Sequence, residues 1–242
     1  MNYAQSEWYG FKKLDFDFQG RSAILVCPDT LDPAGRWLLK TEYFGAFPAF
    51  EIEMLKRGYH VAHVSNITRW HVEEDTHARA EFCRFLTAEF GLNPRCIPVG
   101  MSCGGLQGVY FASTYPELVS VLYLDAPVMN YLSCPGAVGR KDAPMLEEFV
   151  RHKGMTLSEL LNFRDHPVDR IPKLVENRVP VALICGDSDN VVPYHENGRI
   201  LSEVYRREGL PLFEVLKPGC DHHPHGLEDN TPLIEFVERF SI

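Results

Sequence analysis

The chain has 242 residues, of which 45% are hydrophobic and 24% charged, and its formal net charge is −9 at pH 7. These values are typical of an ordinary soluble globular protein with a substantial core, and they exclude a disordered chain. The acidic balance argues against a nucleic-acid-binding face, which would be basic, and against an anionic membrane surface.

Three further features concern the compartment. Residues 1–18 contain no basic segment followed by an apolar one, so we predict no signal peptide. No apolar run approaches the roughly 18–20 residues that span a bilayer. The seven cysteines are scattered, odd in number and without a C-x-x-C pair, which favours reduced thiols over disulfides or a zinc knuckle. We therefore expect a cytoplasmic protein.

The predicted elements begin with a hairpin. Residues 14–18 alternate strictly and lead through "QGR" into the apolar run 22–27. Strands and amphipathic helices then follow one another. Strands are predicted at 59–64, 95–100, 118–124, 179–185 and 212–217, and helices at 48–58, 76–91, 104–116, about 194–207 and 233–240. This alternation predicts one α/β domain over residues 1–242, with a mostly parallel sheet covered on both faces.

One segment, residues 128–178, interrupts the alternation. It carries helix-like patches but no convincing strand, and it follows a predicted strand directly. An insertion at the carboxyl end of a strand lies over the ligand crevice of an open α/β sheet. We therefore predict that residues 128–178 form a lid.

The stretch "CIPVGMSCGG" (96–105) places a serine beside a cysteine between a strand and a helix. This context is the one that a G-x-S-x-G nucleophile elbow requires, and the sharp turn needs small residues two positions before and after the nucleophile. Around Ser102 these positions are Gly100 and Gly104, whereas around Cys103 one of them would be a bulky methionine. Ser102 is therefore the predicted nucleophile, and the backbone N–H of Cys103 the predicted oxyanion donor.

A serine nucleophile needs a general base and an orienting carboxylate. Asp187 and Asp189 follow the strand predicted at 179–185, and His222, His223 and His225 follow the next strand. Both loops fall at the edge where α/β sheets place their sites. The chain order serine, acid, histidine is that of an α/β-hydrolase.

From about residue 22 onward the chain resembles the α/β-hydrolase superfamily. The superfamily's acid commonly ends a G-x-x-D stretch followed by V-P, which corresponds to Asp189, and its histidine commonly ends a G-x-x-H pattern, which corresponds to His222. The stretches "TEYFGAFP", "DAPV" and "HHPHGLED" are similar to a group of bacterial serine hydrolases. The resemblance implies a Ser102–His222–Asp189 triad.

Several alternatives stay open. Asp125 ends another strand from which some members draw their acid, and Asp187 is a second rival. His223 is the main rival of His222, and His225 can instead cap the last helix. The H-H-x-H run lacks the spacing of a helical zinc site. We therefore predict neither a metal nor a cofactor.

The second oxyanion donor is expected in the loop after residues 22–27. Pro28 has no N–H, so the expected donor is Asp29, with Thr30 as the alternative. We expect the connection that follows, and the loop after residues 59–64, to contribute side chains to the crevice. The candidates are Trp37, Lys40, Glu42, Tyr43, Trp70 and His71.

The expected activity is hydrolysis of a small-acyl carboxylic ester through an acyl-enzyme, because a lid of this length suits a modest pocket. Thioesterases, lactonases and peptidases share the same triad, and a ligand-binding protein with negligible turnover has the same fold. The expected partner is a small-molecule ester, and the sequence is compatible with a homo-oligomer.

Overall fold

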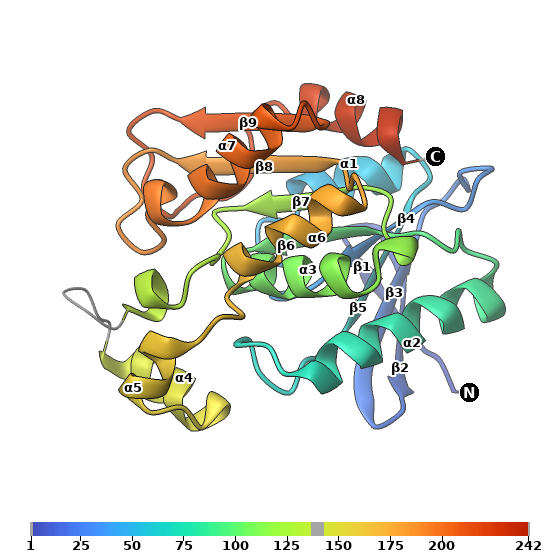
Figure 1. The fold of residues 1–242 in the computed structure, drawn as a ribbon. Helices are drawn as coiled ribbons and strands as arrows, with labels where there is room; N and C mark the ends of the chain where they lie inside the picture. The colour runs from blue at the N-terminus through green and yellow to red at the C-terminus, as the bar shows by residue number, and fades with distance from the viewer. Residues whose placement is uncertain (1, 137–142, 242) are drawn as a thin grey trace.

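The computed structural model describes residues 2–136 and 143–241. Its strands are β1 (Ala4–Trp8), β2 (Phe11–Phe18), β3 (Arg21–Cys27), β4 (Trp37–Lys40), β5 (His60–Val64), β6 (Ile97–Met101), β7 (Leu122–Asp125), β8 (Val181–Gly186) and β9 (Leu212–Lys217). They form one sheet of order β1-β2-β3-β5-β4-β6-β7-β8-β9 (Figure 1).

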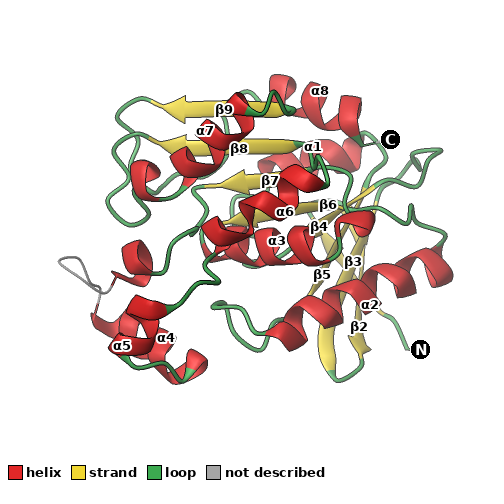
Figure 2. Cartoon of the chain, in the orientation of Figure 1, coloured by secondary structure: helices red, strands yellow, loops and turns green. Residues whose placement is uncertain are grey.

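The α-helices connect and cover these strands. They are α1 (Ala49–Lys56), α2 (Glu73–Phe90), α3 (Cys103–Thr114), α4 (Ala143–Lys153), α5 (Leu157–Asn162), α6 (Ile171–Glu176), α7 (Gly198–Arg207) and α8 (Thr231–Phe240). Buried residues of α2, α3, α6 and α7 share one core cluster with the sheet. Those of α1 and α8 share a second core cluster with the sheet. The sheet is therefore covered on both faces, as Figure 2 shows.

Strand direction alternates on one side of the sheet and is uniform on the other. The pairs β1·β2, β2·β3 and β3·β5 are antiparallel, whereas β5, β4, β6, β7, β8 and β9 are parallel. The predicted hairpin is confirmed: β2 and β3 are joined at Gln19 and Gly20, which both have positive φ, as a tight two-residue turn requires. The prediction of a mostly parallel sheet is confirmed too.

Two strands of the sheet were not predicted, and one of them is central. Strand β4 has four residues, all buried, and pairs in parallel with β5 on one side and β6 on the other. The sequence analysis treated this stretch as part of a long connection, which is wrong. Strand β1, at the sheet edge, was also missed.

Residues 128–178 lie between β7 and β8 and contain no strand among the described residues; positions 137–142 of the predicted lid fall outside them. Helices α4 and α5 lie away from the sheet in Figure 1. They share a third core cluster with Trp70, Leu106 and Tyr131. Helix α6 instead packs on the sheet through Ile171 and Leu174.

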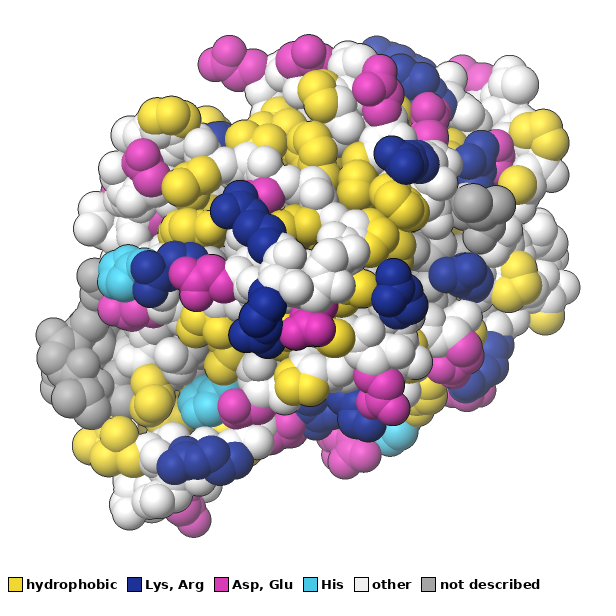
Figure 3. All heavy atoms as spheres, turned by 45° about the horizontal axis from the view of Figure 1, so that its top comes forward, with side chains coloured by type: hydrophobic (Ala, Val, Ile, Leu, Met, Phe, Trp, Pro, Cys, Tyr) yellow, Lys and Arg dark blue, Asp and Glu magenta, His cyan; other side chains and the backbone are white. Residues whose placement is uncertain are grey.

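The surface carries side chains of both charges. On the face in Figure 3, Lys and Arg side chains lie among Asp and Glu, with hydrophobic side chains scattered between them, as is normal for a globular protein. Within residues 2–136 and 143–241, none of the helices combines the length and the apolar character needed to cross a membrane.

Candidate active site

The turn between β6 and α3 places Ser102 in a strained conformation. Its φ of 52° and ψ of −119° are unusual for a non-glycine residue. Hydrogen bonds hold the turn in place: Ser102 N–H donates to the Asp125 carbonyl at 2.9 Å, and the Ser102 carbonyl accepts from Gly105 at 2.9 Å and Val128 at 3.0 Å. The side chain is half-buried at the carboxyl edge of the sheet.

The glycines around Ser102 are required by close approach. A Cβ on Gly100 would lie 2.4 Å from the Gly104 carbonyl oxygen, and a Cβ on Gly105 would lie 2.4 Å from Pro127 Cβ. Gly104 has more room, since its nearest neighbours would lie 3.2 Å away. The turn is therefore a nucleophile elbow by geometry, with Ser102 and not Cys103 at its apex.

The structure brings Asp189 and His222 to this serine. His222 Nδ1 lies 2.8 Å from Asp189 Oδ2, and His222 Nε2 lies 3.1 Å from Ser102 Oγ. A carboxylate only accepts hydrogen bonds, so Nδ1 carries the proton and Nε2 presents its lone pair to the Ser102 hydroxyl. The three side chains thus have the arrangement of a nucleophile, a base and its orienting acid.

Asp189 is held by its own loop. It is 5% exposed, and its Oδ1 accepts from the backbone N–H groups of Val191 at 2.8 Å and Val192 at 2.7 Å. Its neighbour Asp187 is exposed and accepts instead from Gly219 at 2.7 Å. Asp187 therefore links the loop after β8 to the loop after β9, and it is not the carboxylate that binds His222.

A cavity of about 380 Å³ opens at Ser102. Most of its lining is apolar, and its polar lining includes three histidines and one arginine. The lining residues are Tyr43, Ala46, Phe47, Arg69, Met101, Ser102, Met145, Val191, His222, His223 and His225. Its volume lies at the small end of the range of ligand pockets, roughly 300–1,000 Å³.

Cys103 begins helix α3 immediately after the serine, where the predicted N–H donor belongs. Its thiol is buried, and burial raises its pKa to about 11, although the hydrogen bond to Tyr43 acts to lower the pKa. A thiol with this pKa stays protonated at neutral pH and is a poor nucleophile.

The structure does not bring Asp29 or Thr30 to the site. Strand β3 is antiparallel to β5, so the loop after β3 lies at the amino-terminal edge of the parallel strands, opposite Ser102. The Asp32 N–H donates to the Gly58 carbonyl at 3.0 Å just before β5 begins. The expected oxyanion donor Asp29 is therefore wrong, because the unrecognised strand β4 shifted the loop assignment by one strand.

The loop that reaches the site follows β4 instead. A Cβ on Gly104 would lie 3.5 Å from the Glu42 nitrogen, and Tyr43 lines the cavity. Lys40 points elsewhere: it forms a buried ion pair with Glu51, with both side chains 2% exposed. Lys40 Nζ also donates to the Ala46 carbonyl at 3.4 Å, which holds the loop between β4 and α1 in place.

The other residues expected at the crevice lie elsewhere. Trp37 is buried in β4, and Trp70 is buried in the third core cluster. His71 stacks on Tyr110 with ring centroids 3.6 Å apart and lines a different pocket. Glu42 is bound by Asn66 and does not line the cavity.

A second carboxylate–histidine pair stands beside the first. His225 Nδ1 lies 2.6 Å from Asp125 Oδ1, and Asp125 Oδ2 accepts from Gly226 N–H at 2.7 Å and from the Tyr123 hydroxyl at 3.1 Å. Asp125 and His225 were alternatives in the sequence analysis, but their pairing was not predicted. Asp125 is paired with His225, and Asp189 is the carboxylate that pairs with His222.

Sequence reasoning also missed Arg69. Its Nε donates to Glu148 Oε1 at 2.9 Å, which links the loop after β5 to helix α4 beside the cavity. Desolvation opposes the charged form of Arg69, but hydrogen bonds to Glu148 and Tyr43 outweigh it and raise its pKa. No local motif identifies this pair, since its members are 79 residues apart.

The sheet order, the helices on both faces and the sharp turn after β6 define an α/β-hydrolase fold. No family model matches the chain, and no curated protein matches its sequence. The Pyrococcus horikoshii acylaminoacyl peptidase superposes with a TM-score of 0.72 at 15% identity, over 99% of this chain and 42% of that protein.

A second solved structure gives the same result. The Porphyromonas gingivalis dipeptidyl peptidase 4 superposes with a TM-score of 0.67 at 14% identity, over 96% of this chain and 35% of that protein. The chain thus spans well under half the length of either protein. At these identities the likeness establishes the fold.

Proposed function

We propose that this protein is a serine hydrolase that cleaves a carboxylic ester of a small-acyl substrate. The observation that carries the proposal is the continuous hydrogen-bonded chain from Ser102 through His222 to buried Asp189. A strained serine at an elbow, a base with its lone pair toward the hydroxyl and a buried acid are what acyl transfer requires.

In the proposed mechanism Ser102 Oγ attacks the ester carbonyl while His222 Nε2 takes its proton. Asp189 holds the imidazole by its Nδ1–H and stabilises the imidazolium that forms. The oxyanion receives the N–H of Cys103 and, in place of Asp29, an N–H from the loop after β4. Our candidate is the Tyr43 N–H, which in the structure donates to Glu42 Oε1 at 3.3 Å. His222 then protonates the leaving alcohol, and water repeats the cycle on the acyl-enzyme.

The substrate class follows from the cavity. Its volume of about 380 Å³ and largely apolar lining favour a short acyl chain. A peptidase is the second candidate, and the names of the two similar structures, an acylaminoacyl peptidase and a dipeptidyl peptidase, favour it. The two candidates differ in the leaving group and share the mechanism.

The test compares hydrolysis of p-nitrophenyl acetate, butyrate and octanoate with that of aminoacyl p-nitroanilides. We expect activity on the short esters that Ser102→Ala lowers by about 10⁴-fold or more. Ser188→Ala removes an exposed serine from the Asp189 loop and is the matched control, with an expected change below about twofold. Preference for the anilides would instead identify a peptidase.

A binding protein of the same fold is distinguished by labelling. A fluorophosphonate probe should modify Ser102 in the parent protein and leave Ser102→Ala unmodified, because the probe reacts only with an activated serine. If the folded parent protein is not labelled and hydrolyses neither esters nor anilides, the serine hydrolase proposal is wrong.

A further inference from the structure

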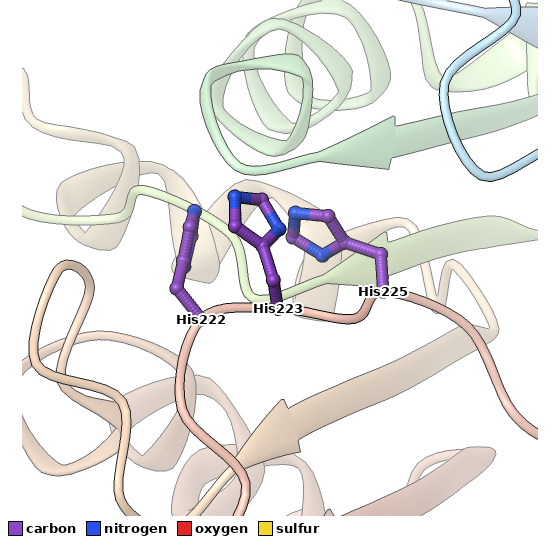
Figure 4. A group of neighbouring side chains, drawn as sticks. All are labelled: His222, His223 and His225. Carbon is purple, nitrogen blue, oxygen red and sulfur yellow. The ribbon is translucent and has the colours of Figure 1, made fainter.

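The loop between β9 and α8 carries three histidines whose rings form a compact triangle. The ring centroids of His222, His223 and His225 lie 4.9, 5.0 and 4.9 Å apart. Figure 4 shows the three rings projecting to the same side of the loop. One nitrogen from each ring lies within 4.8 Å of those of the other two. The proposed mechanism uses only His222.

Two of these rings are oriented as metal-binding histidines are. Asp189 accepts from His222 Nδ1 and Asp125 accepts from His225 Nδ1, which fixes the tautomer in both rings and leaves Nε2 with its lone pair. A histidine that gives one N–H to a carboxylate is a more basic ligand through its other nitrogen. Here two such pairs stand side by side, with the His222 and His225 ring centroids 5.0 Å apart.

The three rings must move closer together to bind one metal ion, and His223 is the ring that can move. Three nitrogens on one tetrahedral zinc ion, each about 2.0–2.1 Å from it, lie roughly 3.3 Å apart. The triangle must therefore contract, and His223, which is exposed, can move toward the two buried rings.

The charge around the triangle favours a cation. Asp189 and Asp125 lie directly behind the rings with side chains 1% exposed, and each places a carboxylate next to one histidine. The cationic side chain in the cavity lining, Arg69, is paired with Glu148. Imidazole ligands select zinc and its transition-metal neighbours over magnesium or calcium, which prefer oxygen.

We propose that His222, His223 and His225 bind a single Zn²⁺ ion, which switches the hydrolase off. The ion takes the Nε2 lone pair of His222, and this is the lone pair that accepts the Ser102 proton in catalysis. Ser102 Oγ, 3.1 Å from that nitrogen, or a water molecule completes the coordination. The inhibitory effect rests on the proposed function, whereas zinc binding does not.

The first experiment measures binding alone, by calorimetric titration of ZnCl₂ into chelator-treated protein without substrate. We expect one ion per chain, binding at least about tenfold weaker in His223→Ala, and no response to MgCl₂. His195→Ala, which removes an exposed histidine outside the triangle, is the matched control and should bind as the parent does. Equal affinity in His223→Ala, or no binding to the parent protein, would overturn the proposal.

The second experiment measures fluorophosphonate labelling of Ser102 with and without ZnCl₂. Zinc should slow labelling of the parent protein at least about tenfold, chelator should restore it, and His223→Ala should need a correspondingly higher zinc concentration. Each variant is compared with its own metal-free rate. Binding without slower labelling would overturn the inhibitory role. A protein that is never labelled contradicts the proposed function, while the titration still decides the zinc site.

Discussion

At the scale of single residues, Asp189 and Asp125 present the same chemistry in two places. Each is a buried carboxylate that accepts from the Nδ1 of one histidine at the rim of one cavity. Only the histidine held by Asp189 contacts Ser102. Whether one of these carboxylates takes part in catalysis therefore depends on whether the Nε2 atom of its histidine contacts Ser102.

This difference predicts unequal effects of the same substitution. Asp189→Asn should lower kcat by about 10³–10⁴-fold, because an amide reverses the hydrogen bond and favours the wrong His222 tautomer. Asp125→Asn should lower kcat by less than about tenfold, since His225 does not contact the serine. Ester kinetics with both folded variants test this. Equal losses, or a larger loss in Asp125→Asn, would contradict the assignment of Asp189 as the acid.

A second residue-scale prediction concerns buried His71. Its Nε2 lies 3.0 Å from Thr76 Oγ1, and its Nδ1 has no partner among the described residues. Burial, followed by the charge of Lys153, lowers the pKa of His71 from 6.5 to about 2. The unfolded chain therefore binds a proton at pH values where the folded protein does not, so this histidine destabilises the fold progressively as pH falls below 6.5.

His71→Phe should remove that dependence. Between pH 6.5 and 4.5 the free energy of unfolding of the parent should fall more steeply than that of the variant, by as much as about 1.4 kcal/mol per pH unit. Urea unfolding at several pH values measures this, and His195→Phe, at an exposed position, provides the control. Parallel pH profiles for the parent and His71→Phe would contradict the prediction.

At the scale of elements, the loop between β4 and α1 depends on a buried ion pair. Lys40 at the end of β4 and Glu51 in α1 pair in the core, and Lys40 also holds the Ala46 carbonyl and lies 3.4 Å from Met101 Sδ. Ala46 lines the cavity on one side, and Met101 precedes the serine. The pair thus helps to position two cavity-lining residues, Ala46 and Met101.

Replacing one member of this ion pair should lower the free energy of unfolding more than replacing both members. Lys40→Met leaves the Glu51 carboxylate buried and unpaired, which should lower the free energy of unfolding by about 3–5 kcal/mol. The double variant Lys40→Met/Glu51→Leu removes both charges and should recover most of that loss. Urea unfolding measures both. A double variant no more stable than Lys40→Met would show that the ion pair itself, and not the unpaired charge, determines the cost.

How far the sequence predicts this fold depends on the length of each element. The long amphipathic helices and the hairpin were predicted because their periodicities extend over many residues. Strand β4 was missed because "WLLK" is four residues long and buried on both faces, which leaves neither alternation nor a helical period to recognise. The error at Asp29 followed directly.

The site shows the same limit. The positions of Ser102, Asp189 and His222 follow from local patterns at strand ends, which is why the sequence could nominate them. The Asp125–His225 and Arg69–Glu148 pairs join residues 100 and 79 positions apart. Such contacts depend on tertiary packing, and nothing in the local sequence encodes them.

At the scale of the whole molecule, the Arg69–Glu148 pair connects α4 to the body of the sheet. Glu148→Gln should change the global free energy of unfolding by less than about 1 kcal/mol, because both side chains are partly exposed. Amide exchange in α4 should accelerate by up to about fivefold. Mass-spectrometric hydrogen exchange tests this, with Glu147→Gln, an exposed neighbour, as control. Unchanged exchange in α4 would show that the pair does not hold the segment.

The position of His222 after the edge strand β9 has a consequence for how the protein is made. The elbow serine and its base are separated by 120 residues, and β9 joins the sheet through β8 alone. Synthesis runs from the amino terminus, and a domain generally folds as a unit. The growing chain therefore contains Ser102 long before it contains His222. On the proposed function, the triad is assembled only after β9 and the loop that follows it have been made, so shorter nascent chains hydrolyse nothing around them.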